Sequence, residues 1–234
     1  MKFEGVYGIG HIVYLAIALI LYAVGLIFLC KHKNDEKVKF VTVKISAAVL
    51  LICIIASRFS VAIKKENDLK YLLPNTFCGL SSLVLSIAVL FGKRDNCVLH
   101  CIAYLGMLGG TITIFYPDFL IEQSFFDILS ITGLLHHAVM VWLVMAIIKT
   151  GYLKPSIKKW FYYPLGLCVI MTLGIFESDC LKFTNSMQIN NPLLSSAPIF
   201  TSWYVVGTIS ILLLIIFLYL YEKFFNKTSQ SENI

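Results

Sequence analysis

The chain contains 234 residues, of which 59% are hydrophobic and 14% are charged, and it carries a formal net charge of +6. Soluble domains average about 45–50% apolar and about 25% charged residues, so this composition excludes an ordinary soluble protein. We therefore expect an integral membrane protein.

Seven apolar stretches are long enough, or nearly long enough, to cross a bilayer, which requires about 20 residues in a helix. They predict an all-α polytopic membrane protein with seven transmembrane helices over residues 12–30, 38–57, 71–91, 98–115, 125–148, 160–176 and 203–221. The connections between these stretches are short, so we expect residues 1–234 to form a single bundle without a soluble domain.

The first apolar stretch is expected to remain as a helix. It is longer than a typical signal-peptide core, and no small-x-small cleavage pattern precedes the charges that follow it. The second stretch carries Lys44 near its start, Asp127 lies at the beginning of the fifth, and the sixth is on the short side.

Basic residues concentrate in alternate connections between the predicted helices. The first, third and fifth connections and the C-terminal tail are rich in Lys and Arg, whereas the fourth has no base and the sixth has only Lys182. By the positive-inside rule, the N-terminus is outside and the C-terminus is cytoplasmic. The second connection departs from this pattern, because it contains Arg58, Lys64, Lys65 and Lys70.

The positive charge does not indicate a nucleic-acid partner, since most bases lie in loops where membrane topology and anionic headgroups account for them. Seven cysteines, an odd number scattered mainly through apolar stretches, do not form a disulfide framework. Cys97 and Cys101 flank His100 at a spacing that a metal ion would allow, but thiols at a helix end more often pack as small apolar side chains. We predict no metal and no cofactor.

Cys78 lies at the start of the third apolar stretch, where a reactive polar group is costly and indicates a functional site. Pro74 is suited to the first turn of this helix, and Asn75 and Thr76 add polar groups there. Three serines continue the same helix face: Ser81, Ser82 and Ser86. A packed thiol, with serines that allow close helix contact, is the alternative explanation of this pattern.

His136 and His137 lie inside the fifth stretch, and at most one of them points at a given site because adjacent helical residues are about 100° apart. Cys78 lies about 10 Å into its helix counted from Tyr71, and His137 about 13 Å into its helix counted from Ile128. Similar depths allow a Cys–His pair, in which histidine accepts the proton and the thiolate attacks. A buried histidine that only holds a structural hydrogen bond is the alternative.

Short motifs follow one another along nearly the whole chain: Tyr7-Gly8-Ile9-Gly10-His11, Leu72-Leu73-Pro74 through Cys78, Gly106 to Gly110, Tyr116-Pro117-Asp118, His137, Asn185, Pro192 and Trp203-Tyr204. In this order and spacing, the chain resembles the YwaF-like bacterial membrane proteins, which are related to transmembrane protein 164 of animals. The animal relatives are described as lipid acyltransferases that use a cysteine and a histidine in the membrane.

The resemblance implies that Cys78 is a nucleophile that forms an acyl-thioester with a donor phospholipid. His137 would be the base, with His136 as the alternative. The residues expected to contact substrate around them are Asn75, Thr76, Ser82, Asn185, Trp203 and Tyr204. The implied partners are phospholipids of the cell membrane. The composition, low in Arg and high in Lys, Ile and Asn, fits an AT-rich bacterial genome, so we expect a multi-pass protein of a bacterial plasma membrane.

The chain departs from the bacterial members at Thr76, where they often carry a histidine two residues before the cysteine. If that histidine were required, the chain would not be active. The alternative function is non-enzymatic: a small-solute carrier, a lipid-binding protein or a sensor. In that case the two histidines, Asp127 and Lys44 would line a polar cavity.

Overall fold

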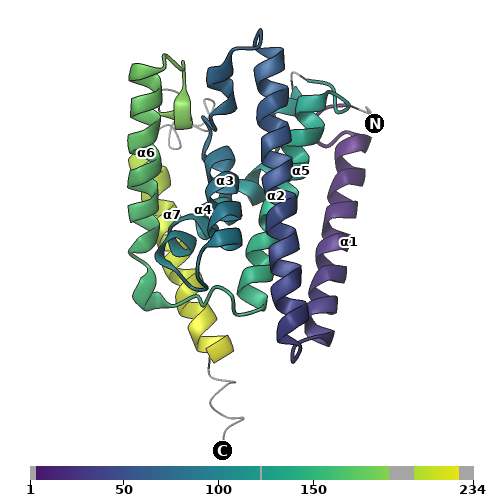
Figure 1. Ribbon diagram of the computed structural model, residues 1–234, viewed down its shortest axis with the longest axis vertical. Helices are drawn as coiled ribbons and strands as arrows, with labels where there is room; N and C mark the ends of the chain where they lie inside the picture. The colour runs from purple at the N-terminus through teal and green to yellow at the C-terminus, as the bar shows by residue number, and fades with distance from the viewer. Residues whose placement is uncertain (1–3, 122, 190–202, 227–234) are drawn as a thin grey trace, which may run out of the picture.

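The computed structural model describes residues 4–121, 123–189 and 203–226, which form an all-helical bundle without strands (Figure 1). The long helices are α1 (Ile9–Lys31), α2 (Glu36–Lys64), α3 (Phe77–Phe91), α4 (Cys97–Phe115), α5 (Ile128–Lys149), α6 (Tyr162–Cys180) and α7 (Trp203–Tyr221). Short helical turns in the connections are η1 (Leu69–Leu72), η2 (Asp118–Ile121), η3 (Ile157–Lys159) and η4 (Ser186–Gln188), and α7 continues into η6 (Glu222–Asn226). The predicted all-α fold is confirmed.

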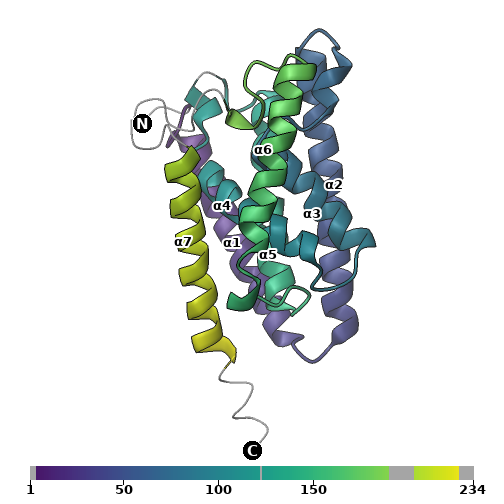
Figure 2. The same ribbon diagram turned by 90° about the vertical axis from the view of Figure 1, so that its left-hand side faces the viewer.

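Within the described residues, six helices are long and apolar enough to cross a membrane, whereas α3 has 15 residues. At ~1.5 Å per residue α3 is about 22 Å long, less than the ~30 Å hydrocarbon core. Large apolar side chains such as Ile20, Leu21 and Ile52 are exposed on the outside of the bundle, as contact with lipid requires. Helices α1 and α7 begin at the same end of the bundle and α7 ends at the other (Figures 1 and 2). The orientation in the membrane stays a prediction.

The third helix begins at Phe77, six residues later than the expected start at Tyr71. Residues Leu69–Leu72 form η1, and Leu73 is extended (ψ 138°) because the following proline disfavours helical geometry before it. Thr76 rather than Pro74 opens α3: its hydroxyl accepts a hydrogen bond from the Gly79 N–H at 3.1 Å. Cys78 is therefore the second residue of α3, not the eighth of a longer helix.

Helix α2 extends to Lys64, beyond the expected end at Ser57. Residues 58–64 contain no glycine or proline, so nothing in the sequence stops the helix there. Arg58 and Lys64, which departed from the charge pattern, are thus helical residues. Lys64 forms an ion pair with Asp127, the N-cap of α5, at 2.9 Å.

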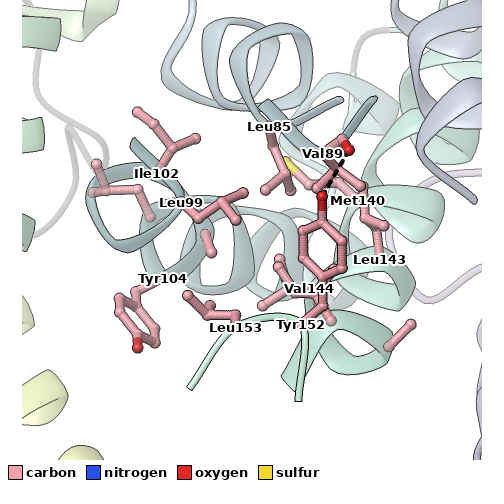
Figure 3. Close-up of a cluster of buried hydrophobic side chains, with 14 of the residues drawn as sticks. Leu85, Val89, Leu99, Ile102, Tyr104, Met140, Leu143, Val144, Tyr152 and Leu153 are labelled. Carbon is pink, nitrogen blue, oxygen red and sulfur yellow. Dashed lines mark hydrogen bonds between the residues drawn. The ribbon is translucent and has the colours of Figure 1, made fainter. Parts of the chain in front are cut away.

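The core lies where α2, α3, α4 and α5 meet, and buried Leu85, Leu99 and Met140 belong to it (Figure 3). Polar side chains that reach into the bundle find partners on neighbouring helices. Trp142 donates to the Ser46 hydroxyl at 2.9 Å and joins α5 to α2, and the Tyr152 hydroxyl donates to the Val89 carbonyl at 3.0 Å. Such bonds matter because an unsatisfied polar group in lipid costs several kcal/mol, on the order of 2–7.

Candidate active site

The N-terminus of α3 carries the candidate nucleophile. Thr76 caps the helix, and Cys78 follows in its first turn. The first backbone N–H groups of a helix have no intrahelical acceptor, and their dipoles favour negative charge. This location suits a thiolate, or an oxyanion that forms beside it.

Helix α4 approaches Cys78 closely because it presents glycine at the contact. A Cβ atom on Gly109 would lie 2.8 Å from the Cys78 Sγ, nearer than real Cβ contacts occur. The Cys78 thiol is also in hydrogen-bond contact with the Thr113 side chain, one turn along α4. The Thr113 hydroxyl in turn donates to the Gly109 carbonyl at 3.0 Å. The thiol is thus positioned by two residues of α4.

His137 contributes an imidazole from α5. Its Nδ1 lies 2.6 Å from the Gly133 carbonyl, which accepts a hydrogen bond from Nδ1–H. This contact leaves Nε2 as the basic nitrogen of the neutral ring. The His136 ring lies 4.0 Å away by centroids, with its own Nδ1 3.1 Å from the Thr132 carbonyl.

Cys78 and His137 line the same cavity, which has a volume of about 250 Å³. Its walls come from α3 to α7 and from the turns η2 and η4, and the polar lining residues are Thr76, Cys78, Thr113, Asp118, His137, Tyr163, Gln188 and Ser210. His136 is not among the residues that line it. The two adjacent histidines therefore differ in the way the helical geometry predicts, and His137 is the one that lines the same cavity as the thiol.

The other expected contact residues are placed unevenly. Thr76 lines the cavity, whereas Asn75 and Ser82 do not. The Asn75 side-chain oxygen accepts a hydrogen bond from Arg58 at 3.1 Å, and the Asn75 backbone carbonyl accepts one from the backbone N–H of Met187. The buried Ser82 hydroxyl lies 3.1 Å from the sulfur of Met140, so this serine packs α3 against α5.

The remaining predicted contacts lie in the second half of the chain. Asn185 does not line the cavity, but it is the N-cap position of η4, whose last residue, Gln188, does. Trp203 and Tyr204 are the first residues of α7. Their side chains, and Pro192 of the sequence motif, lie outside the part of the chain that the structure describes.

Several lining residues were not predicted from the sequence. Asp118 was named only as part of the Tyr116-Pro117-Asp118 motif, yet it lines the cavity from η2. Thr113, Tyr163 and Ser210 lie in apolar stretches where a single hydroxyl gives no distinctive pattern. The helical spacing of Gly109 and Thr113, four residues apart, was the available indication that both face one neighbour.

Among the described residues, no group of three or more His, Cys, Asp or Glu side chains is arranged to hold a metal ion. His100 does not join Cys97 and Cys101 in such a group. Its Nε2 lies 2.8 Å from an Asp95 oxygen and 3.2 Å from the Lys159 Nζ.

The sequence pattern that defines the TMEM164 family matches residues 6–221. The chain belongs to the TMEM164 family. No curated protein and no solved structure matches it. The match spans every helix that forms the cavity, so Cys78 and His137 lie within the family region.

The cavity combines groups that suit acyl transfer. A thiol is a nucleophile as the thiolate, and a neutral imidazole in the same cavity is a base that suits its proton. The N-terminal N–H groups of α3 are donors for a carbonyl oxygen that becomes negative during attack. This chemistry requires no metal or cofactor.

Proposed function

We propose that this protein is a membrane-embedded acyltransferase that moves acyl chains between phospholipids through a thioester on Cys78. The observation that carries the proposal is the shared cavity of Cys78 and His137, inside a bundle whose outer surface is apolar. A substrate that enters such a cavity from the bilayer is itself a lipid, and glycerophospholipids supply the ester that a thiolate attacks.

In the first half-reaction, the Cys78 Sγ attacks the ester carbonyl of a donor phospholipid, and His137 Nε2 takes the thiol proton. The backbone N–H of Cys78 and the positive end of α3 stabilise the oxyanion. The tetrahedral intermediate collapses with cleavage of the carbon–oxygen ester bond. His137 returns the proton to the departing lysophospholipid alkoxide, and the acyl group remains on sulfur.

In the second half-reaction, the hydroxyl of an acceptor lysophospholipid attacks the thioester carbonyl while His137 takes its proton. The carbon–sulfur bond breaks, a new diacyl phospholipid leaves, and the proton returns to the Cys78 thiolate. Every proton and acyl group is accounted for, because an ester is exchanged for an ester. Thr113, beside the thiol, and Asp118, at the cavity wall, are further polar groups for contact with the polar part of the lipid.

The test is an acyl-transfer assay with purified protein in lipid. A phospholipid labelled in its acyl chain is offered with a panel of lysophospholipids, and new labelled diacyl lipid is measured. Wild type is compared with Cys78→Ala and with Cys53→Ala, which removes a buried thiol of α2 that does not line the cavity. We expect transfer by wild type and Cys53→Ala and none by Cys78→Ala.

The covalent intermediate gives a second readout. Wild type incubated with donor alone should gain the mass of an acyl group, which hydroxylamine removes, and Cys78→Ala should not. Folded wild type that transfers no acyl group from any donor would refute the enzyme and favour the non-enzymatic alternative, a lipid-binding protein, carrier or sensor.

A further inference from the structure

A second cavity of about 280 Å³ adjoins the Cys78–His137 cavity. The two share three lining residues: Leu108 of α4, Tyr163 of α6 and Ser210 of α7. Since the same side chains border both, the two cavities are neighbours along α7. Together they reach the range of ~300–1,000 Å³ that is usual for small-molecule sites.

The two parts differ in chemistry. The first cavity has Asp118, His137 and Gln188 in its wall. The second is lined mainly by aliphatic and aromatic side chains of α4, α5 and α7, and none of its described lining residues carries a formal charge. A molecule with a polar reactive end and an apolar tail matches this division, with its reactive end beside Cys78.

We propose that the second cavity is the acyl-chain channel of the enzyme and that Tyr104 and Phe217, at its far end, limit the length of the chain that is transferred. This inference rests on the proposed function, because it places the acyl carbonyl at Cys78. The occupant is one saturated or unsaturated fatty-acyl chain of a phospholipid.

The length of the space agrees with such a chain. Val206 lines the first cavity and Phe217 the second, and eleven residues of α7 separate them. At ~1.5 Å per residue this is about 16 Å along the helix. One leaflet of a bilayer core of ~30 Å is about 15 Å deep, which is the space that one lipid chain fills.

The far end of the channel is held by side-chain contacts. The rings of Tyr104 and Phe217 meet edge to face, with centroids 6.3 Å apart. The Tyr104 hydroxyl lies 3.4 Å from His100 Nδ1, and the other nitrogen of His100 lies 2.8 Å from Asp95. Tyr104 lies at the margin of the buried cluster in Figure 3, so packing holds it on one side and the His100 contact at its tip. Tyr104 therefore closes this end from the buried side, whereas Phe217, whose side chain is 41% exposed, closes it from α7.

The first experiment measures chain-length preference with lauroyl, palmitoyl and arachidoyl donor phospholipids. Leu108→Trp fills the junction between the cavities, and Phe217→Ala opens the far end. The control Leu212→Trp introduces the same bulk on a side chain of α7 that is 54% exposed and does not line either cavity. A single methylene that does not fit an apolar pocket changes selectivity by about 10–200-fold.

We therefore expect Leu108→Trp to reduce palmitoyl relative to lauroyl transfer by about 10-fold or more, and Phe217→Ala to raise arachidoyl relative to palmitoyl transfer by a similar factor. Leu212→Trp should keep the wild-type profile. Unchanged profiles in folded Leu108→Trp and Phe217→Ala would overturn the channel.

A second experiment does not depend on catalysis. Cys78→Ala is incubated in lipid with palmitoyl lysophosphatidylcholine that carries a diazirine at its terminal carbon, irradiated, and digested for mass spectrometry. We expect crosslinks on the segments around Tyr104 and Phe217, and their loss in the double variant with Leu108→Trp. Crosslinks there without any transfer by wild type would support the channel and refute the enzyme. Transfer by wild type, with crosslinks only on residues that line neither cavity, would refute the channel.

Discussion

Gly109 of α4 lies directly against Cys78 of α3, so closely that a methyl group on Gly109 would be 2.8 Å from Sγ. Small residues allow such approaches between membrane helices, and Gly106 and Gly110 serve the same purpose against Met140. At Gly109 the neighbouring atom is the thiol, so here the glycine affects the position of the reactive group.

Gly109→Ala should reduce acyl transfer more than it reduces stability. The added methyl group requires Cys78 to leave its present position, and misplacement by about 1 Å can cost about 100-fold in rate. We expect a loss of 10-fold or more in the rate of thioester formation, measured by intact mass after mixing with donor lipid.

Gly207→Ala is the matched control for this substitution. Gly207 is on α7, and a Cβ atom there would have no atom of the described residues within 4 Å. Alanine favours the helix over glycine by roughly 0.5–1 kcal/mol, so this variant should be active and no less stable. Equal rates for the Gly109→Ala and Gly207→Ala variants would contradict the role of the Gly109 contact.

The two histidines should behave differently when replaced. His137→Gln removes the base that shares the cavity with Cys78, and removal of a general base typically costs about 10²–10⁴-fold in rate. His136→Leu should retain transfer. His136 Nε2 is buried without a hydrogen-bond partner among the described residues, so an apolar replacement removes an unsatisfied group and should not lower the melting temperature.

Rates of thioester formation and thermal unfolding in detergent, measured on both variants, check this prediction. An active His137→Gln with an inactive, folded His136→Leu would assign the base to His136 instead. Both rings donate from Nδ1 to the backbone carbonyl four residues earlier on α5. The prediction that His137 is the base therefore depends on its position in the cavity wall.

The sequence predicted all seven helices, but it ended α2 too early, at the charged residues after Ser57, and it misplaced the start of α3. Tyr71, Leu72 and Leu73 are as apolar as the helix that follows, so hydropathy alone merges them with it. The hydrogen bond from the Gly79 N–H to the Thr76 hydroxyl sets the start of the helix. Hydropathy averaged over a window of residues does not detect such a single capping residue.

The site was predictable only in part. Helical geometry shows that His136 and His137 diverge, but the rotation of α5 about its axis depends on packing against α2 and α4. Ser82 was expected in the site because it shares a helix face with Cys78. In the structure the Ser82 hydroxyl instead contacts the sulfur of Met140 on α5. No sequence pattern indicated the second cavity, because the apolar residues that line it are of the same types as those that face lipid.

Thr76→Ala should weaken the first turn of α3 and with it the position of Cys78. Loss of an N-cap hydroxyl costs about 0.5–2 kcal/mol, and the fraying it permits is confined to the turn that carries the thiol. Thr76→Ser keeps the hydroxyl and should retain both stability and transfer. Hydrogen exchange of the α3 amides, together with the transfer rate, distinguishes this capping role from direct contact with substrate.

If Thr76 acts only through the cap, transfer by Thr76→Asp should also be retained, because Asp is a good N-cap residue. Transfer that is lost in Thr76→Asp despite normal protection of the α3 amides would instead indicate direct substrate contact at the cavity wall.

Asp95 joins the connection between α3 and α4 to the segment before α6. Its carboxylate accepts hydrogen bonds from Lys159 Nζ at 2.5 Å and from the Lys154 backbone N–H at 3.0 Å. Burial favours a higher pKa for Asp95, but the hydrogen bonds from Lys159, Lys154 and His100 outweigh it and hold the pKa below its usual 3.8. The ionised form is therefore the one that stabilises the fold.

Asp95→Asn should lower the melting temperature at neutral pH, by the equivalent of about 1.5–3 kcal/mol for lost bonds to a charged group. The pKa of Asp95 is lower in the folded state. The extra stability of wild type over Asp95→Asn is therefore fully present above pH 3.8 and declines as the pH falls through the folded-state pKa. Thermal unfolding in detergent, recorded from neutral to strongly acidic pH, should show the two melting temperatures converging at the acid end. Other carboxylates titrate in both proteins, so the difference between the curves isolates Asp95, and a difference that stays constant over the whole range would contradict this account of its charge.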